Sequence, residues 1–231
     1  MTIDEKVLEA FYNIISESKQ EMYDRIAGDR TAYIAVVMEN IRKDHNASAV
    51  IRTCDCFGIQ NLHTIEKEVE YVVQREISKG ASNWIDLHSH SEGENPGLDC
   101  VHNLKNQGYQ IVSTTPHTDK TIQDIPIDKP IALVFGTEIH GISQAVLDIS
   151  DHLVRIPMYG LTDSFNVSVS AALTLISLRG RLENSTQNWK LSHDEQVALK
   201  IQWCTKIVRD GEVVEHKIRR RILEKERSEE H

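Results

Sequence analysis

The sequence lacks several features that would assign it to a common class. Its 231 residues include only four cysteines, which are too few and too scattered for a disulfide framework, and we expect them to be reduced, mainly packing residues. No apolar run approaches the roughly 20 residues that cross a bilayer. Residues 1–25 are acidic and amphipathic, without the apolar segment of a signal peptide. We therefore expect a soluble, cytoplasmic protein without a membrane segment.

Positive charge is also scarce. The chain has 26 Lys and Arg against 35 Asp and Glu, a net charge of −9, which argues against binding nucleic acid through bulk positive charge. Its densest basic run is HKIRRR, residues 216–221, which contains Lys217, Arg219, Arg220 and Arg221. Because the acidic sequence EKERSEE follows it, this pattern alone favours a solvated helix face.

The glycine-rich motifs of nucleotide-binding proteins are missing as well. The first predicted strand runs into ENIRKDHNAS, which has no glycine, and no Walker A pattern is present. β-rich runs nevertheless alternate with helical patterns, which predicts an α/β fold with a parallel sheet and helices on both faces. The predicted strands are 33–38, 61–65, 84–88, 109–115, 131–136 and 152–158, and the helices between them are 46–57, 74–80, 97–106, 141–148 and 165–182.

Helical patterns flank this alternating region. Residues 1–28 are typical of one or two helices, and residues 193–228 of two more, interrupted at RDGE (209–212), where Gly211 can turn the chain. We therefore expect a core domain of residues 29–182 between helical extensions at 1–28 and 183–231.

The segment HNASAVIRTCDCFG, residues 45–58, places a cation in a stretch suited to close packing. A helix starting near Asn46 would bury one face and carry Arg52 on another. Asn46 is a good N-cap candidate. Arg52 could instead form an ordinary pair with Asp55, worth a few tenths of a kcal/mol. The buried face would contain Ala47, Val50, Cys54 and Phe57.

Two later segments also follow predicted strands. In FGTEIHGIS (135–143), Gly136 and Gly141 bracket Glu138, and such glycines allow a backbone to approach a ligand. In IPMYGLTDSFNVSVSAA (156–172), Ser164 and Asn166 are the polar groups at the entrance of a helix of small residues. An ordinary turn and helix capping are the alternatives. Since parallel sheets bind ligands at the carboxyl ends of their strands, each of these segments is a candidate ligand-binding loop.

Taken together, the three segments resemble the signature motifs of the SpoU/TrmH family of RNA ribose 2′-O-methyltransferases, members of the SPOUT class. They read N-x-x-A-x-x-R-T-C-D-x-x-G, then G-x-E-x-x-G-I-S, then I-P-M-x-G…S-F-N-V-S-V-S-A-A. The resemblance covers about Tyr33 to Leu182, with Phe165 where the family usually has leucine. SKGASNWIDL (78–87) resembles the branch of the family that acts on tRNA.

This resemblance implies a C-terminal trefoil knot and an obligate homodimer whose active sites draw on both chains. It also implies that S-adenosylmethionine is bound, bent, in the knot loops rather than on a glycine-rich turn. The implied cofactor-binding residues are Thr114, Gly136, Glu138, Ile156, Met158, Phe165 and Asn166.

The implied reaction is attack of a ribose 2′-oxygen on the methyl group of the sulfonium. Arg52 matches the catalytic arginine of the family. A guanidinium does not give up its proton in proteins, so we expect Arg52 to bind the adjacent phosphate and stabilise the developing alkoxide. Asn46 and Glu138 would orient Arg52, and Ser164 and Asn166 would position the ribose.

Short helical extensions at both ends resemble the tRNA branch, whose substrate is the guanosine at nucleotide 18 of the D-loop. Lys217, Arg219, Arg220 and Arg221 then become candidate RNA contacts alongside Arg52. The alternatives are methylation of a ribosomal ribose and a non-catalytic RNA-binding relative. A metalloprotein built on HSH (88–90) and the eleven histidines is disfavoured, because no cysteine or carboxylate stands at ligand spacing, and we expect no metal.

Overall fold

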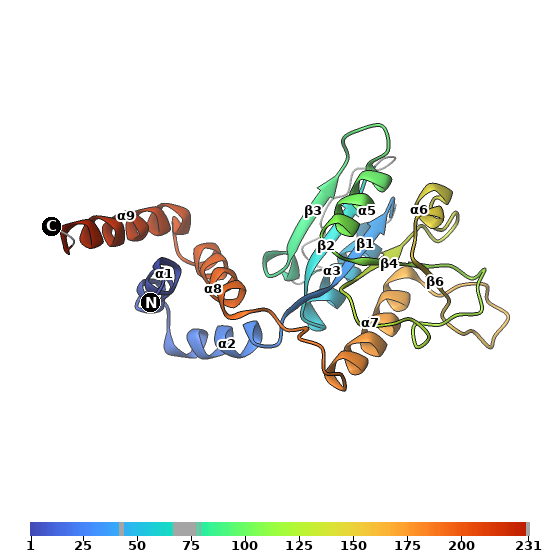
Figure 1. Cartoon of the computed structure of the whole chain (residues 1–231), viewed down its shortest axis with the longest axis horizontal. Coiled ribbons are helices and arrows are strands. Elements are labelled where there is room, and N and C mark those ends of the chain that lie inside the picture. Colours follow the sequence, from blue (N-terminus) through green and yellow to red (C-terminus); the bar gives the residue numbers. More distant parts are fainter. Residues whose placement is uncertain (42–43, 67–77, 79, 230–231) are drawn as a thin grey trace. The chain divides into compact units, whose positions relative to one another are not determined.

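The computed structural model describes residues 1–41, 44–66, 78 and 80–229, and these fall into two units. One unit combines residues 1–30 with 190–231, and the other is Thr31–Trp189 (Figure 1). The helix predicted at 74–80 lies, apart from its residues 78 and 80, outside the described residues. The division into a core of 29–182 and two separate extensions stays a prediction.

Parallel strands form the central sheet of the second unit. All neighbouring pairs are parallel, and the order is β3-β2-β1-β5-β4-β6. Central β1 and β5 are buried almost throughout, as expected for a sheet covered on both faces. The strands in the described residues are β1 (Thr31–Glu39), β2 (Ile59–Ile65), β3 (Asp86–His90), β4 (Gln110–Thr114), β5 (Ile131–Phe135) and β6 (His152–Val154).

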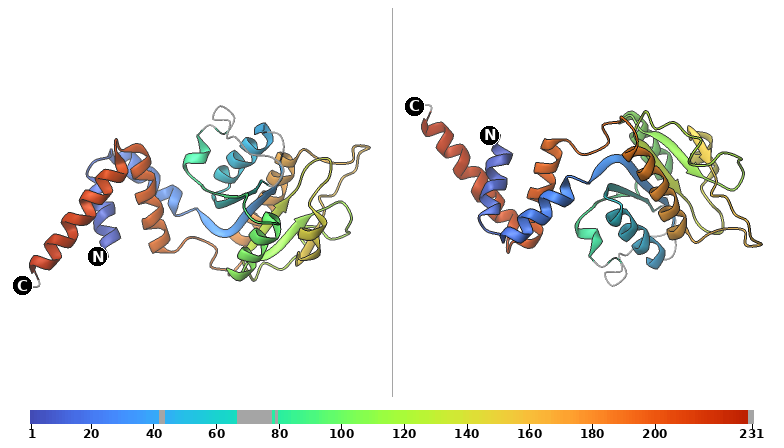
Figure 2. Two further views of the ribbon diagram at one scale, coloured as in Figure 1. Left: turned by 90° about the horizontal axis from the view of Figure 1, so that it is seen from above. Right: turned by 90° about the horizontal axis from the view of Figure 1, so that it is seen from below.

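Helices cover both faces of this sheet, as predicted (Figure 2). On one face, alternate β1 residues such as Val36 pack with α3 (Asp44–Cys56) and α7 (Val167–Glu183). On the other face, residues such as Val37 pack with α5 (Pro96–Asn106) and α6 (Gln144–Asp148). The alternation follows from the two-residue period of strands.

Several predicted boundaries are wrong by two to four residues, and three of them have a clear local cause. Strand β6 ends at Val154 rather than 158, because the chain approaches Pro157, which cannot donate to a ladder. Strand β3 begins at Asp86 rather than 84, after the short 3₁₀ helix η1 (Ala81–Asn83). Helix α6 begins at Gln144 rather than 141, because Gly141 adopts φ +67° and pairs back with Thr137.

The sheet has a switch point between β1 and β5. After β1 the chain passes through α3 on one face and returns as β2, whereas after β5 it passes through α6 on the opposite face and returns as β6. The two connections therefore diverge and leave a crevice above the carboxyl ends of β1 and β5. Open α/β sheets bind ligands at such points.

The other unit consists of helices from both ends of the chain, as the helical patterns predicted. They are α1 (Ile3–Tyr12), α2 (Glu17–Ala27), α8 (His193–Ile207) and α9 (Gly211–Glu229). Its core contains Trp203, whose ring meets Tyr23 edge-on at 5.2 Å and lies 5.4 Å from the guanidinium of Arg30. Gly211 allows the break between α8 and α9, since a Cβ there would lie 2.1 Å from the Thr205 carbonyl oxygen. Among the described helices, none has the length and apolar character needed to cross a bilayer.

Candidate active site

Polar side chains from all three sequence motifs meet at the switch point. Asn166 donates through Nδ2 to Oδ1 of Asn46 at 3.0 Å, and Asn46 in turn donates through Nδ2 to Oε1 of Glu138. These residues come from the start of α7, from α3 and from the loop after β5. Asn46, in the middle, is only 2% exposed, so it is removed from competing water. The structure thus brings the three motif segments into contact at one site.

The two asparagines differ in how they relate to helix caps. The prediction that Asn46 caps its helix is wrong, because α3 begins at Asp44 and Asn46 lies inside the first turn. Asn166 is the N-cap of α7, which begins at Val167, and its Oδ1 accepts from the Ser168 amide at 2.9 Å. Its Nδ2 remains available for Asn46, so one amide both caps α7 and joins the polar network.

Close backbone contact fixes the loop that carries Glu138. Thr137 and Gly141 exchange two backbone hydrogen bonds, of 3.0 and 2.9 Å. A Cβ on Gly136 would lie 2.2 Å from the Gly141 backbone, so the glycine is needed for this approach. The loop therefore has little freedom, and Glu138 is held at the crevice.

A residue that the sequence reasoning missed anchors the far end of this loop. Glu39, the last residue of β1, is 4% exposed, and its carboxylate accepts from both the amide and the hydroxyl of Ser143, at 2.8 and 2.7 Å. This ties the end of β1 directly to the start of α6. The sequence feature that could have indicated Glu39 is an acidic residue at the end of an apolar strand.

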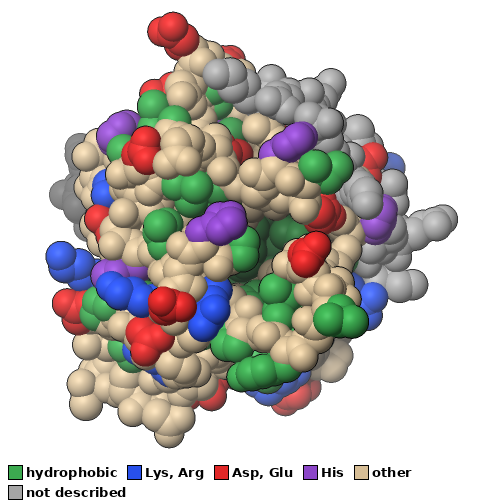
Figure 3. Space-filling model, turned by 90° about the vertical axis from the view of Figure 1, so that its right-hand side faces the viewer, with side chains coloured by type: hydrophobic (Ala, Val, Ile, Leu, Met, Phe, Trp, Pro, Cys, Tyr) green, Lys and Arg blue, Asp and Glu red, His purple; other side chains and the backbone are tan. Residues whose placement is uncertain are grey.

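A cavity of about 370 Å³ opens beside this network. Figure 3 shows that end of the unit hollowed, with hydrophobic side chains on the walls and charged side chains on the rim. The predicted cofactor residues line it, except for Asn166. The predicted lining residues are Thr114, Gly136, Glu138, Ile156, Met158 and Phe165, and the lining residues not predicted for the cofactor include His117, His140, Arg155, Asp163 and Ser164.

Arg52 does not join the network within one chain. It is exposed, and it forms no ion pair or hydrogen bond with any residue that the structure describes, so the alternative pairing with Asp55 is not found. It lies six residues after Asn46, roughly 9 Å farther along α3 and on a different face. Its predicted side-chain environment, with Asn46 and Glu138 orienting it, is therefore absent from the single chain. The predicted burial of Ala47, Val50 and Cys54 is confirmed.

The four basic residues predicted to contact RNA have different surroundings. Arg219 pairs with Asp4 at 2.5 Å and with Glu215 at 2.7 Å, and Arg220 lies 3.7 Å from Glu224. Lys217 and Arg221 are exposed and have no partner among the described side chains. The run is therefore not one uniform positive surface.

Comparison with known proteins relates this site to characterised enzymes. Residues 33–176 match the model of the SpoU rRNA Methylase family. The chain is 32% identical to a tRNA (guanosine(18)-2′-O)-methyltransferase of Borreliella burgdorferi, over 88% of this chain and 92% of the relative. It is also 32% identical to the enzyme of that name from Thermus thermophilus, over 69% and 81% of the two chains.

A solved structure supports the same relationship. The crystal structure of the Aquifex aeolicus TrmH/SpoU tRNA modifying enzyme superposes with a TM-score of 0.73 at 26% identity. The superposition covers 84% of this chain and 98% of that one. The likeness therefore extends well beyond the three motifs.

Proposed function

Because the chain belongs to the SpoU rRNA Methylase family, we propose that it methylates a ribose 2′-hydroxyl of tRNA, at the D-loop guanosine 18, with S-adenosylmethionine as donor. One observation carries the proposal: the Asn166–Asn46–Glu138 network joins all three motif segments beside a single cavity. The enzyme acts on cytoplasmic tRNA.

The residues around the cavity fit the proposed donor. A volume of about 370 Å³ lies within the range of small-molecule sites. Gly136 lines this cavity, and Ile156, Met158 and Phe165 supply apolar walls for an adenine ring. Thr114, at the end of β4, and the Asn166 segment complete the set. When bound, the donor supplies an electrophilic methyl group, and the loops after β5 and β6 that hold it form the proposed trefoil knot.

This chain's own residues would hold the ribose and its phosphate. Ser164, on the cavity wall, and Asn166, at the end of the network, position the ribose hydroxyl. Glu138 and Asn46 keep that end of the pocket polar and rigid. Arg52 provides a fork of donors for the adjacent phosphate and stabilises negative charge developing on the 2′-oxygen. Orientation and electrostatics thus supply the catalysis.

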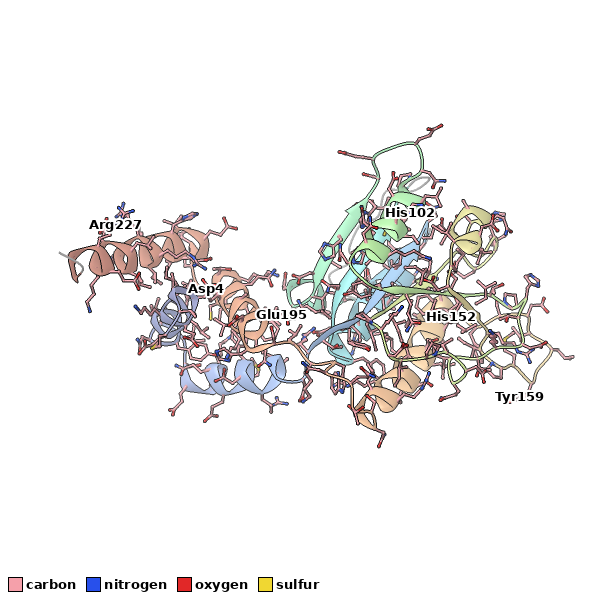
Figure 4. The ribbon with its side chains drawn as sticks, viewed as in Figure 1. Asp4, His102, His152, Tyr159, Glu195 and Arg227 are labelled. Carbon is pink, nitrogen blue, oxygen red and sulfur yellow. The ribbon has the colours of Figure 1, made fainter. Side chains whose placement is uncertain are left out.

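A second copy of the chain completes the site. Helix α7 buries Ala171, Leu175 and Leu178 against the sheet, yet it exposes Val169, Leu173 and Ile176 by 43, 41 and 60%. An apolar stripe at this spacing on a helix already packed on its other side fits a protein interface. Tyr159, labelled in Figure 4, and Leu161 add exposed apolar surface on the loop after β6. In the proposed homodimer, Arg52, which has no partner among the described residues of its own chain, serves the pocket of the other subunit.

The helical unit supplies the remaining RNA contacts. Lys217 and Arg221, which pair with no side chain in the described part of the chain, can bind phosphates. Arg219 and Arg220 lie on the same helix with part of their charge already neutralised. Binding through such contacts weakens steeply with salt because counterions are released from the RNA.

Transfer of labelled methyl groups tests the function directly. Purified protein is incubated with labelled S-adenosylmethionine and either unmodified tRNA transcripts or unmodified ribosomal RNA, and the product is located by mass spectrometry. We expect 2′-O-methylguanosine at nucleotide 18 of tRNA. Label in ribosomal RNA alone would select the alternative substrate, and failure to label either RNA would contradict the enzyme proposal.

A further inference from the structure

Two histidines and a cysteine meet beside the edge strand of the sheet, away from the pocket described above. His63 on β2 and His90 on β3 have stacked rings, with Nδ1 of His63 3.0 Å from Nε2 of His90. Cys100 reaches the same place from α5 and is fully buried. One nitrogen from each histidine and the cysteine sulfur all lie within 4.8 Å of one another.

This is the donor set that binds zinc in proteins. Zinc binds imidazole nitrogen at about 2.0–2.1 Å and thiolate sulfur at about 2.3 Å, so two ligands of one tetrahedral ion lie roughly 3.3–3.8 Å apart. The cluster needs only shifts of about an ångström or less to reach this geometry.

We propose that His63, His90 and Cys100 bind one divalent transition-metal ion of the zinc class, which fastens α5 to the β2–β3 edge of the sheet. Each histidine donates a lone pair, and Cys100 donates sulfur after releasing its thiol proton to solvent, so no group is oxidised or reduced. Magnesium and calcium do not fit, because they prefer oxygen ligands.

The surroundings leave space for a fourth ligand. A cavity of about 430 Å³ adjoins the cluster, and besides the three ligands it is lined by His88, Asn61, Asn103 and Gln107. The ring of His88 stacks on His63 at 4.5 Å, and its Nε2 lies 3.2 Å from Oδ1 of Asn61. We assign the fourth position to a water molecule in this cavity, because three protein ligands with one open position is an established zinc arrangement.

The expectation of no metal rested on ligand spacing along the chain, judged from HSH (88–90) and the eleven histidines. It overlooked His63 and Cys100, because their proximity to His90 depends on strand register and on how α5 packs. In the register, His63 pairs with His88 and Ile65 with His90, which places all three histidines on two adjacent strands. The spacing that matters is therefore across the sheet rather than along the chain.

Metal content of the full-length protein tests the proposal. After chelation, reconstitution with zinc and desalting, we expect one zinc per chain by mass spectrometry. Cys100→Ser and His90→Asn should each weaken zinc affinity at least about tenfold, since each removes a ligand. Matched controls are Cys54→Ser, which alters another fully buried helical cysteine, and His102→Asn, which alters an exposed histidine on α5 (Figure 4). Both controls should retain the ion.

A second measurement does not depend on how the variants fold. Wild-type protein loaded with cobalt(II) should show the intense visible bands of four-coordinate cobalt and a near-ultraviolet sulfur-to-metal charge-transfer band. Absence of stoichiometric metal in the wild type, or a cobalt spectrum without the sulfur band, would overturn the proposal. Equal zinc affinity in Cys100→Ser, His90→Asn and both controls would overturn it as well.

Discussion

The sequence predicted functional residues both at the crevice above β1 and β5 and in the basic run on α9. In the structure the two sets differ in whether their side chains contact one another. At the crevice, Asn46, Glu138 and Asn166 contact one another in a continuous network. On α9, two of the four cations lie beside acidic side chains, and the other two have no partner among the residues that the structure describes. The difference arises because the three motifs follow β1, β5 and β6, whose carboxyl ends lie at the same edge of the parallel sheet. Consecutive side chains on a helix instead point in all directions around its axis.

The largest expected effect comes from removing Arg52, the predicted catalytic residue that the network does not hold. We expect Arg52→Ala to lower kcat for tRNA methylation about 10²–10³-fold, because a charged donor to the developing alkoxide and to the phosphate is lost. Cofactor affinity should stay within about twofold, since Arg52 does not line the cavity. Single-turnover methyl transfer and calorimetric titration with the cofactor measure the two quantities.

Arg52→Lys provides the matched control. It keeps the positive charge but loses the planar fork, so we expect an activity between those of the wild type and Arg52→Ala. Wild-type turnover by Arg52→Ala would remove this residue from the mechanism and leave the crevice network as the whole site.

Gly136→Ala tests whether the loop geometry at the crevice is as tight as its contacts indicate. The new Cβ would lie 2.2 Å from the Gly141 backbone, so the loop must shift. We expect about 2–3 kcal/mol of destabilisation in urea unfolding, together with loss of cofactor binding. Gly160→Ala is the control, because a Cβ there meets nothing within 4 Å. Equal stability of the two variants would show that the loop adapts freely.

Asn46→Asp tests the network itself by placing a second carboxylate against Glu138. We expect about tenfold slower methyl transfer and a stability loss of about 1–3 kcal/mol. The buried amide of Asn46 that donates to Glu138 is replaced by a carboxylate, which cannot donate when ionised and has the same negative charge as Glu138. The double variant Asn46→Asp/Glu138→Gln restores one donor and one acceptor and should recover part of the stability lost by Asn46→Asp. Simple additivity of the two substitutions would mean that the two side chains do not interact.

Much of the fold could be predicted because burial imposes periodic patterns. The apolar runs gave the parallel strands, and the face of α3 formed by Ala47, Val50 and Cys54 is buried as expected. The motifs also placed Gly136, Ile156 and Phe165 at one pocket. Boundaries such as the end of β6 depended on turn chemistry and were less accurate.

Other features could not be predicted, because they depend on packing between distant elements. The hydrogen bonds from Ser143 to Glu39 form only because the fold places the end of β1 beside the start of α6. The neutralisation of Arg219 depends on Asp4, at the opposite end of the sequence. The catalytic roles of Asn46, Glu138 and Arg52 stay predictions, since geometry in one chain does not test them.

The smallest expected effects concern α9. There, the loss of tRNA affinity on removing one basic side chain should depend on whether that side chain already has an acidic partner. Lys217→Ala and Arg221→Ala should each weaken tRNA binding severalfold and lower the salt slope of binding by about one, because each removes an uncommitted phosphate contact. Arg219→Ala should change affinity less, because Asp4 and Glu215 already offset its charge, and should instead cost about 0.5–1 kcal/mol of stability. Filter binding over a range of salt concentrations, with thermal unfolding of the same variants, separates these outcomes. If Arg219→Ala gave the largest loss of tRNA affinity, the ion pairs of Arg219 would have to break when tRNA binds. The contacts of α9 would then centre on Arg219, as those of the crevice centre on Asn46.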